Sequence, residues 1–377
     1  MKFKADRSTL LKALAHIQSV AEKRNTIPIL ANALIRVDGG KLSFTATDME
    51  IAVVEEVATV EASRDGATTA PAATLYEIVR KLPEGAEVEL DQPGGEAPLA
   101  LRAGRYGTSM VTLPTDDFPS MTAGTLPHRF HLSALALRGL IDRTRFAIST
   151  EETRYYLNGI YLHTADGEGG RVLRAVATDG HRLARVEERE PEGAAGMPGV
   201  IVPRKTVAEL RKLLDEEGGD VEVGLSDTRI QFRVGSVQLT SKLIDGTFPE
   251  YERVIPKDND KVLRVGNREF SDAVSRVAAI SSERSRPVKL SLDRDLLTLS
   301  AASPEQGTAS EELDDGQVQY ASGPLEIGFQ ARYLNDITDQ IAKDKAVEFC
   351  FSDGAAPTIV RDANDPSALY VLMPMRV

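Results

Sequence analysis

Val176–Leu183 reads VATDGHRL and governs how the rest of the chain is interpreted. An apolar run that ends in Asp179 and Gly180 predicts a strand followed by a tight turn, because glycine tolerates a positive φ and aspartate bonds its own backbone. A second stretch, Phe44–Ile51, reads FTATDMEI, and the two ATD turns lie 131 residues apart. The same turn is therefore predicted twice in one chain, which indicates a repeated fold.

Other features recur at nearly the same interval. Pro71 and Pro203 each precede a predicted helix and lie 132 residues apart, and Phe118-Pro119 and Phe248-Pro249 lie 130 residues apart. Apolar residues at helical spacing predict three pairs of helices. The pairs are Thr9–Val20 with Ala73–Leu82, Ser133–Arg145 (with Ser133 as N-cap) with Lys205–Leu214, and Glu269–Ala279 with Ala331–Ala342. We therefore expect three domains, at residues 1–126, 127–253 and 254–377.

Alternating apolar residues on either side of a polar turn predict a β-hairpin in each domain. The three strand pairs are Leu34–Val37 with Lys41–Thr47, Gly159–His163 with Leu173–Thr178, and Val288–Leu292 with Leu296–Ala301. Two apolar helix faces per domain are best buried on one face of an antiparallel sheet, which predicts an α+β fold. Because no Gly/Ser-rich or Pro-rich linker separates the thirds, we expect them to be locked together.

Composition narrows the class of protein. The chain of 377 residues is long enough for two or three domains, and its hydrophobic and charged fractions are those of a globular protein. A single cysteine, Cys350, excludes an intrachain disulfide framework and a multi-cysteine metal site, and we expect it to be a buried packing residue. The N-terminus shows no secretory signal and no apolar run is long enough to span a bilayer, which predicts the cytoplasm and no membrane partner.

Charge gives two opposing indications about nucleic acid. A net charge of −12 would repel phosphate if it were spread evenly over the surface. The helices predicted in the first two thirds are net positive, however, whereas those of the last third are slightly negative. This separation favours one face that tolerates phosphate, and ordinary solvated helix faces are the alternative interpretation.

Asp179 and His181 allow a catalytic hypothesis. Residues i and i+2 of a strand point the same way, so an orienting carboxylate and a base could act together in a hydrolase. No nucleophile elbow, phosphate loop or HExxH motif accompanies them, and the other histidines have no ligand spacing with His181. Binding is therefore favoured over catalysis, and no catalytic residue, metal or cofactor is predicted. Besides DNA binding and catalysis, a third hypothesis is that the chain is a repeat scaffold unrelated to DNA.

The chain ends in Tyr370–Val377, YVLMPMRV, which is unusually apolar. Tyr370–Leu372 is predicted to be a last buried strand. Because Pro374 has no N–H to donate to a sheet, Met373–Met375 are expected to leave it. Two flexible methionines beside a proline suit an adaptable binding surface. Deleting Met373–Val377 should therefore abolish peptide binding while leaving the thermal stability nearly intact.

Several motifs in order resemble those of the bacterial sliding clamps, the β subunits of DNA polymerase III, over essentially the full length. They are the opening MKF, TIPIL at 26–30, LP at 113–114 followed by DFP at 117–119, RYYLNG at 154–159, VATDGHRL at 176–183, VPRK at 202–205, and the ending MPMR. The resemblance implies a head-to-tail homodimer whose six similar domains form a ring around double-stranded DNA, with helices lining the pore. It also implies no catalytic activity and contact with DNA that is independent of sequence.

The resemblance further implies where partners bind. A peptide pocket between the second and third domains would take short motifs of replicative and translesion DNA polymerases, the clamp loader and mismatch-repair proteins, and the ring would be nucleoid-associated. Its residues would be Leu157, Thr178, Gly180, His181, Arg182, Leu183, Pro249, Arg253, Val254, Tyr333, Val371, Leu372, Met373, Pro374, Met375 and Arg376. DNA contacts would be Arg24, Tyr155, Tyr156, Arg204 and Lys205, and the dimer edge would hold Thr108, Met110, Ile280 and Ser281. Glu151, Ala73 and Ser281 depart from the family pattern.

Overall fold

The computed structural model describes residues 1–22, 26–57, 61–95, 97–216, 218–281, 287–314 and 316–376. The chain packs into two compact units. The first comprises Met1–Arg138, Pro191–Pro198 and Lys205–Leu243, and the second comprises Gly139–Glu190, Gly199–Arg204 and Ile244–Val377. The middle of the chain therefore contributes to both units, and the three-domain boundaries stay a prediction.

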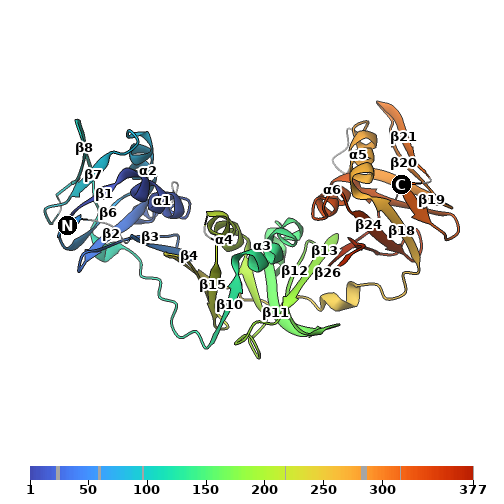
Figure 1. The fold of residues 1–377 in the computed structure, drawn as a ribbon, viewed down its shortest axis with the longest axis horizontal. Coiled ribbons are helices and arrows are strands. Elements are labelled where there is room, and N and C mark those ends of the chain that lie inside the picture. Colours follow the sequence, from blue (N-terminus) through green and yellow to red (C-terminus); the bar gives the residue numbers. More distant parts are fainter. Residues whose placement is uncertain are drawn as a thin grey trace. The chain divides into compact units, whose positions relative to one another are not determined.

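All six predicted helices are present, with ends that differ by a few residues (Figure 1). They are α1 (Arg7–Gln18), α2 (Ala72–Lys81), α3 (Ala134–Asp142), α4 (Arg204–Glu216), α5 (Asn267–Ala278) and α6 (Ala331–Thr338). α1 begins earlier than predicted because the Asp6 carboxylate caps it, accepting a hydrogen bond from the Ser8 N–H at 2.7 Å. α6 ends earlier than predicted, at Thr338, and the Asn267 amide satisfies carbonyl oxygens at and beyond its end by donating to Thr338 at 2.9 Å and Ile341 at 2.6 Å.

In the first unit, the described residues form two antiparallel sheets, with strand orders β5-β1-β7-β8-β9 and β10-β15-β16-β17-β4-β3-β2-β6. Their strands are β1 (Lys2–Asp6), β2 (Asn32–Asp38), β3 (Lys41–Thr47), β4 (Ile51–Val57), β5 (Glu61–Arg64), β6 (Gly66–Pro71), β7 (Glu87–Asp91), β8 (Leu99–Ala103), β9 (Tyr106–Met110), β10 (His128–Ser133), β15 (Asp220–Leu225), β16 (Arg229–Val234) and β17 (Val237–Lys242). Short 3₁₀ helices follow at η1 (Pro28–Ala31) and η2 (Thr115–Asp117).

In the second unit, the described residues form sheets of order β14-β11-β12-β13-β26-β25-β24-β18-β22 and β21-β20-β19-β23. Their strands are β11 (Gly159–Gly167), β12 (Gly170–Thr178), β13 (Arg182–Arg189), β14 (Val200–Pro203), β18 (Lys261–Gly266), β19 (Pro287–Asp293), β20 (Leu296–Ser303), β21 (Gly307–Leu313), β22 (Val318–Tyr320), β23 (Leu325–Gln330), β24 (Ala346–Phe351), β25 (Thr358–Asp362) and β26 (Asp365–Leu372). The 3₁₀ helices here are η3 (Arg145–Ala147), η4 (Glu152–Leu157) and η5 (Tyr251–Val254).

The local predictions of strands and caps are confirmed. The three predicted hairpins are β2–β3, β11–β12 and β19–β20, and all three pair antiparallel. β11 and β12 run further than predicted, to Gly167 and from Gly170, because the turn between them takes only two residues. Ser133 caps α3 as predicted, since its hydroxyl accepts a hydrogen bond from the Ala136 N–H at 3.1 Å.

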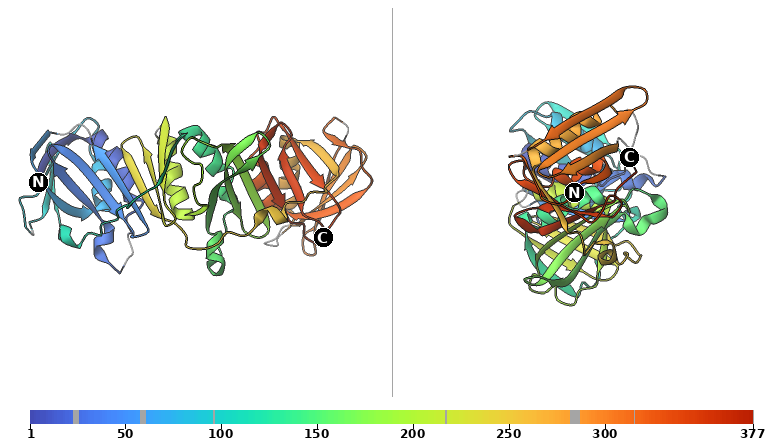
Figure 2. Two further views of the ribbon diagram at one scale, coloured as in Figure 1. Left: turned by 90° about the horizontal axis from the view of Figure 1, so that it is seen from below. Right: turned by 90° about the vertical axis from the view of Figure 1, so that its right-hand side faces the viewer.

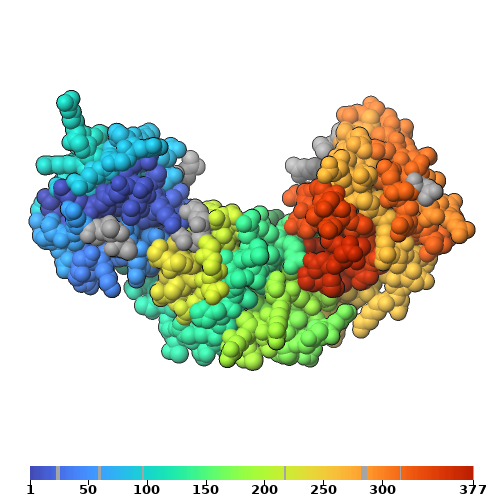
Figure 3. Space-filling view, viewed as in Figure 1, coloured from blue at the N-terminus to red at the C-terminus, as the bar shows by residue number. Residues whose placement is uncertain are grey.

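Long-range strand pairing joins segments that the sequence leaves separate. β4 pairs with β17, with Val53 opposite Leu239, and β13 pairs with β26, with Leu183 opposite Val371. Figure 2 shows each large sheet passing from strands of one colour to strands of another, from blue to yellow-green in the first unit and from green to red in the second. In the second unit, the C-terminal residues lie beside those of the middle of the chain, red beside green in Figure 3.

Each of the helix pairs α1–α2 and α5–α6 packs together and contacts two sheets, where the sequence predicts one. α1 contacts β3 and β4 of the eight-stranded sheet and β1 of the five-stranded sheet. Leu10, Leu14 and Ile17 of α1 are fully buried, and so is Phe3 on β1. The second sheet arises because β1 leads directly into α1 and alternates buried with half-exposed residues. No helix in the described part of the chain is long and apolar enough to cross a membrane.

The C-terminal tail leaves the sheet where predicted, because β26 ends at Leu372. The tail is nevertheless bound to the fold. The Met373 N–H donates to the His181 carbonyl at 2.9 Å, and the Met375 N–H donates to the Gly328 carbonyl of β23 at 2.8 Å. Removing residues 373–377 would break these two backbone hydrogen bonds, and the expectation that this costs the core little stays a prediction.

Candidate functional site

The turn between β12 and β13 is built by its own side chains. The Thr178 hydroxyl donates to the Arg182 carbonyl at 2.7 Å and accepts from the Gly180 N–H at 3.1 Å. The Asp179 carboxylate accepts from the N–H groups of His181 at 2.9 Å and Arg182 at 3.0 Å. Gly180 has φ +88°, which only glycine adopts without strain.

The first copy of the turn, between β3 and β4, has the same hydrogen bonds. Thr47 Oγ1 donates to the Ile51 carbonyl at 2.8 Å and accepts from the Met49 N–H at 3.0 Å, and Asp48 Oδ1 accepts from the Ile51 N–H at 2.7 Å. Met49 takes φ +76° without being glycine. The predicted repeat is thus confirmed at the level of individual bonds, and the copies differ in the side chains they carry.

These turn positions rule out the geometric basis of the hydrolase hypothesis. Asp179 and His181 lie after β12 ends at Thr178 and before β13 begins at Arg182, so the argument from strand alternation is wrong. The Asp179 carboxylate is occupied by the two N–H groups of the turn and by Arg182 Nε at 3.2 Å. The His181 ring lies 6.2 Å from the Tyr333 ring, nearly parallel to it.

Arg182 ties the turn to α6. Its side chain is 5% exposed and pairs with Asp179 and Asp336. Nη2 donates to the Phe146 carbonyl at 2.7 Å, and the guanidinium lies 4.4 Å from the centre of the Tyr333 ring. A buried arginine with this many partners fixes a position in the fold, which the sequence did not reveal because its partners are remote in the chain.

An apolar cluster underlies the turn and contains several predicted pocket residues. It comprises Leu157, Val176, Leu183, Ile201, Phe248, Tyr251 and Val371. The Tyr161 ring stacks on Phe248 with centroids 4.8 Å apart. Val254 is 51% exposed and Met373 is 41% exposed, and each lies within three residues of a cluster member in the chain, so large apolar side chains remain open to solvent there.

The other predicted pocket residues line hollows on the same unit. Pro249 and Arg253 line one of about 880 Å³ together with Tyr161 and His163. Pro374, Met375 and Arg376 line another of about 960 Å³ over the sheet that contains β23. All of the predicted pocket residues belong to the second unit, but these two hollows have no lining residue in common, so the single pocket stays a prediction.

A buried network holds the segment that carries Pro249 and Val254, and sequence reasoning missed it. Arg174 Nη1 donates to the Tyr251 hydroxyl at 3.2 Å and to Glu252 Oε1 at 2.7 Å, and Nε donates to Glu187 Oε1 at 2.7 Å. His163 Nε2 lies 3.0 Å from the Tyr251 hydroxyl, and burial lowers the pKa of His163. An arginine within an apolar strand was the signal that could have indicated this network.

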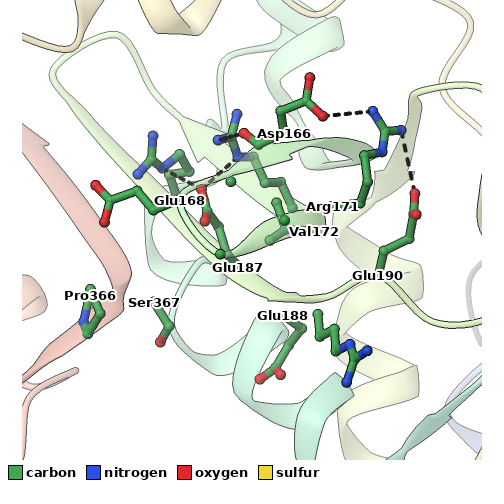
Figure 4. A pocket seen from close by; sticks show the side chains of 15 residues that line it. Asp166, Glu168, Arg171, Val172, Glu187, Glu188, Glu190, Pro366 and Ser367 are labelled. Atoms are coloured by element: carbon green, nitrogen blue, oxygen red, sulfur yellow. Dashed lines mark hydrogen bonds and ion pairs between the residues drawn. The ribbon is translucent and has the colours of Figure 1, made fainter.

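A third hollow, of about 940 Å³, lies beside the same strands and was not predicted (Figure 4). Arg171 Nη1 pairs with Asp166 at 3.3 Å and Arg171 Nη2 with Glu190 at 3.5 Å, as the dashed lines show. Arg174 and Glu187, which also line it, pair with each other. Because these charges neutralise one another, the hollow is a salt-bridged surface.

The residues predicted to contact DNA differ in their exposure to solvent and in whether another side chain already pairs with them. Tyr155 is 53% exposed and meets Tyr156 edge to face at 5.7 Å, and Arg204 is exposed. The Lys205 ammonium is paired with Asp48 of the first turn and lies 3.7 Å from Glu22. The prediction for Arg24 lies outside the described residues.

The predicted dimer residues lie in two regions of the chain, one on a strand and one after a helix. Thr108 and Met110 belong to β9, at the edge of the five-stranded sheet. Ile280 and Ser281 follow α5, and Ser281 is buried at 2% exposure within the single chain, with its hydroxyl lacking a hydrogen-bond partner in the described structure. Cys350 is buried as expected, and its thiol lies 3.7 Å from Glu348 Oε1.

Comparison with known proteins covers the whole chain. Residues 1–122, 131–250 and 252–376 match the families described as the N-terminal, central and C-terminal domains of the DNA polymerase III beta subunit. The chain is 52% identical to the beta sliding clamp of Caulobacter vibrioides over 377 residues and 40% identical to that of Escherichia coli K12 over 379, with each pair covered at 100%.

Solved structures agree with this. A sliding clamp from Bartonella birtlesii bound to griselimycin superposes with a TM-score of 0.95 at 49% identity, and one from Pseudomonas aeruginosa bound to griselimycin does so with 0.94 at 39%, each over 100% of both chains. The resemblance read from the sequence motifs is thereby confirmed over the full length. This chain belongs to the bacterial DNA polymerase III β-subunit family, the β sliding clamps.

Proposed function

We propose that this chain is a processivity factor that closes as a homodimeric ring around double-stranded DNA and tethers DNA polymerase to it, in the cytoplasm on the nucleoid. The observation that carries the proposal is the match of three consecutive clamp domains from residue 1 to residue 376. Tethering by topology requires no catalytic group and only weak, sequence-independent attraction to phosphate. The exposed edge of β9, with Thr108, supports a head-to-tail contact with another copy.

DNA contact would come from the exposed Tyr155 and from Arg204, with Tyr156 and Arg24 beside them in the family pattern. Tyrosine and arginine can meet the backbone or stack without reading bases. Lys205 contributes less in this proposal, because Asp48 already neutralises its ammonium.

The apolar cluster, the turn at Thr178–Leu183 and the tail at Met373–Arg376 would form the pocket for partner motifs. Replicative and translesion polymerases, the clamp loader and mismatch-repair proteins would insert leucine or phenylalanine anchors there. Burying one such side chain gains about 1.5–3 kcal/mol, which is about tenfold or more in affinity. The exposed Met373 and Val254 beside a buried base support this assignment.

Two measurements test the proposal. The ring should be retained on circular DNA after loading and lost from linear DNA, and a monomer at micromolar concentration that is never trapped would contradict it. A peptide with a glutamine-leucine-phenylalanine type motif should bind the full chain about tenfold or more tighter than a chain that lacks residues 373–377. If both forms bind the peptide equally well, the assignment of the tail to the pocket is wrong.

A further inference from the structure

The two copies of the turn differ at a position where the backbone is unusual. Met49 and Gly180 both have positive φ, of +76° and +88°. A non-glycine residue is strained in this region, yet the first copy carries one. The backbone of this turn therefore tolerates a side chain in the first copy, whereas the glycine of the second copy leaves space for a neighbouring group.

The Arg154 side chain lies against Gly180. A Cβ placed on Gly180 would lie 2.5 Å from Arg154 Nη1, so the guanidinium occupies the space that a side chain would fill. Arg154 sits within η4 with φ −109° and ψ 49°, which departs from helical geometry. The chain bends at this residue, and its side chain lies over the turn.

Glu151 holds the guanidinium in place. Arg154 Nε donates to Glu151 Oε2 at 2.8 Å and Nη2 donates to Oε1 at 2.6 Å, a bidentate pair that fixes the plane of the guanidinium. The hydrogen bond to Arg154 lowers the pKa of Glu151, so the pair stays ionised at neutral pH. The third guanidinium nitrogen, Nη1, takes no part in this pair, and it donates to no acceptor among the residues that the structure describes.

We propose that Glu151 is a positioning residue, which holds Arg154 so that Nη1 is presented over Gly180 as a donor to an oxygen acceptor of a docked partner segment. The proposal rests on the peptide-binding function proposed above. An arginine fixed before the partner arrives loses less rotamer entropy on binding than a free one.

Binding of the motif peptide to the full chain tests the proposal through Glu151→Gln, Arg154→Ala, their double variant and Arg154→Lys. Glu151→Gln should weaken binding roughly three- to tenfold, the cost of ordering one long side chain. In the Arg154→Ala background the same change should have no further effect. Arg154→Lys should not rescue binding, because an ammonium cannot pair bidentately and present a third nitrogen. Glu152→Gln is the matched control, since Glu152 is an exposed neighbour with no ion pair among the described residues.

The outcomes separate this inference from the function on which it rests. If the unaltered chain does not bind the peptide, the pocket itself is wrong and the inference falls with it. If the unaltered chain binds and Glu151→Gln binds equally well, only the inference is overturned. It is also overturned if Glu152→Gln weakens binding as much as Glu151→Gln, or if the losses from the Glu151 and Arg154 changes add in the double variant. Equal thermal unfolding of all variants shows that the fold is intact.

Discussion

Replacing Arg182 by alanine should destabilise the second unit more than any exposed ion pair can. The Arg182 side chain is 5% exposed and pairs with Asp179 and Asp336, whose side chains are 18% and 28% exposed. It also donates to the Phe146 carbonyl and lies over the ring of Tyr333. The substitution removes a buried cation that pairs with both carboxylates, and it leaves the partly buried Phe146 carbonyl without this donor.

The magnitude follows from this geometry. Breaking a buried pair by removing one partner costs about 3–5 kcal/mol. Water can reach both carboxylates in part, so we expect the lower end, about 3 kcal/mol. For a unit of this size, 1 kcal/mol shifts Tm by about 2–4 °C, which gives a decrease of roughly 6–12 °C.

Thermal unfolding of the full chain measures this loss, with Arg332→Ala as the control. Arg332 also pairs with Asp336, at 3.5 Å, but its side chain is 78% exposed, so its removal should cost less than about 1 kcal/mol. A Tm for Arg182→Ala within about 2 °C of the unaltered chain would refute the reasoning, since it would place the loss at about 1 kcal/mol or less. So would an equal loss in Arg332→Ala.

Three further predictions concern other sites. Burial lowers the pKa of His163, so its contribution to stability is present above the ordinary histidine pKa of about 6.5 and is lost as the pH falls below that value. The decrease in Tm between pH 7 and pH 5.5 should therefore be smaller in His163→Gln than in the unaltered chain. An equal decrease in both would contradict this. Gly159→Ala should lower Tm strongly, because its Cβ would lie 2.2 Å from a carbonyl oxygen of β14, whereas Gly323→Ala meets nothing within 4 Å and should unfold like the unaltered chain. Asp48→Asn should release Lys205 and steepen the salt dependence of DNA binding by about one phosphate contact, while an unchanged slope would show that Lys205 is already available.

The sequence by itself determined the elements and their repetition. Helical spacing of apolar residues located all six helices, and alternation with turn residues located the three hairpins. The Thr-Asp turn recurs with the same hydrogen bonds in both copies. These features were predictable because the atoms that decide them lie within a few residues of one another in the chain.

The family motifs also predicted, from the sequence, the class of protein and a set of site residues. The full-length match confirms the family, and the turn, the apolar cluster and the tail place most of the predicted pocket residues in one unit. The assignment of those residues to peptide, DNA or dimer contact stays a prediction. A motif identifies a residue by type and order, whereas its availability depends on what surrounds it.

Only the tertiary structure decided which charged side chains are already neutralised by an ion pair within the chain. Lys205 is paired with Asp48, 157 residues away in the chain, and Arg182 is paired with Asp336, 154 residues away. The Arg154 guanidinium lies over Gly180, in the space that a side chain at position 180 would fill. Such contacts carry no local pattern, because they depend on how separate strands and helices pack. The same holds for the β4–β17 and β13–β26 pairings, whose register is set by matching buried faces and not by any turn between them.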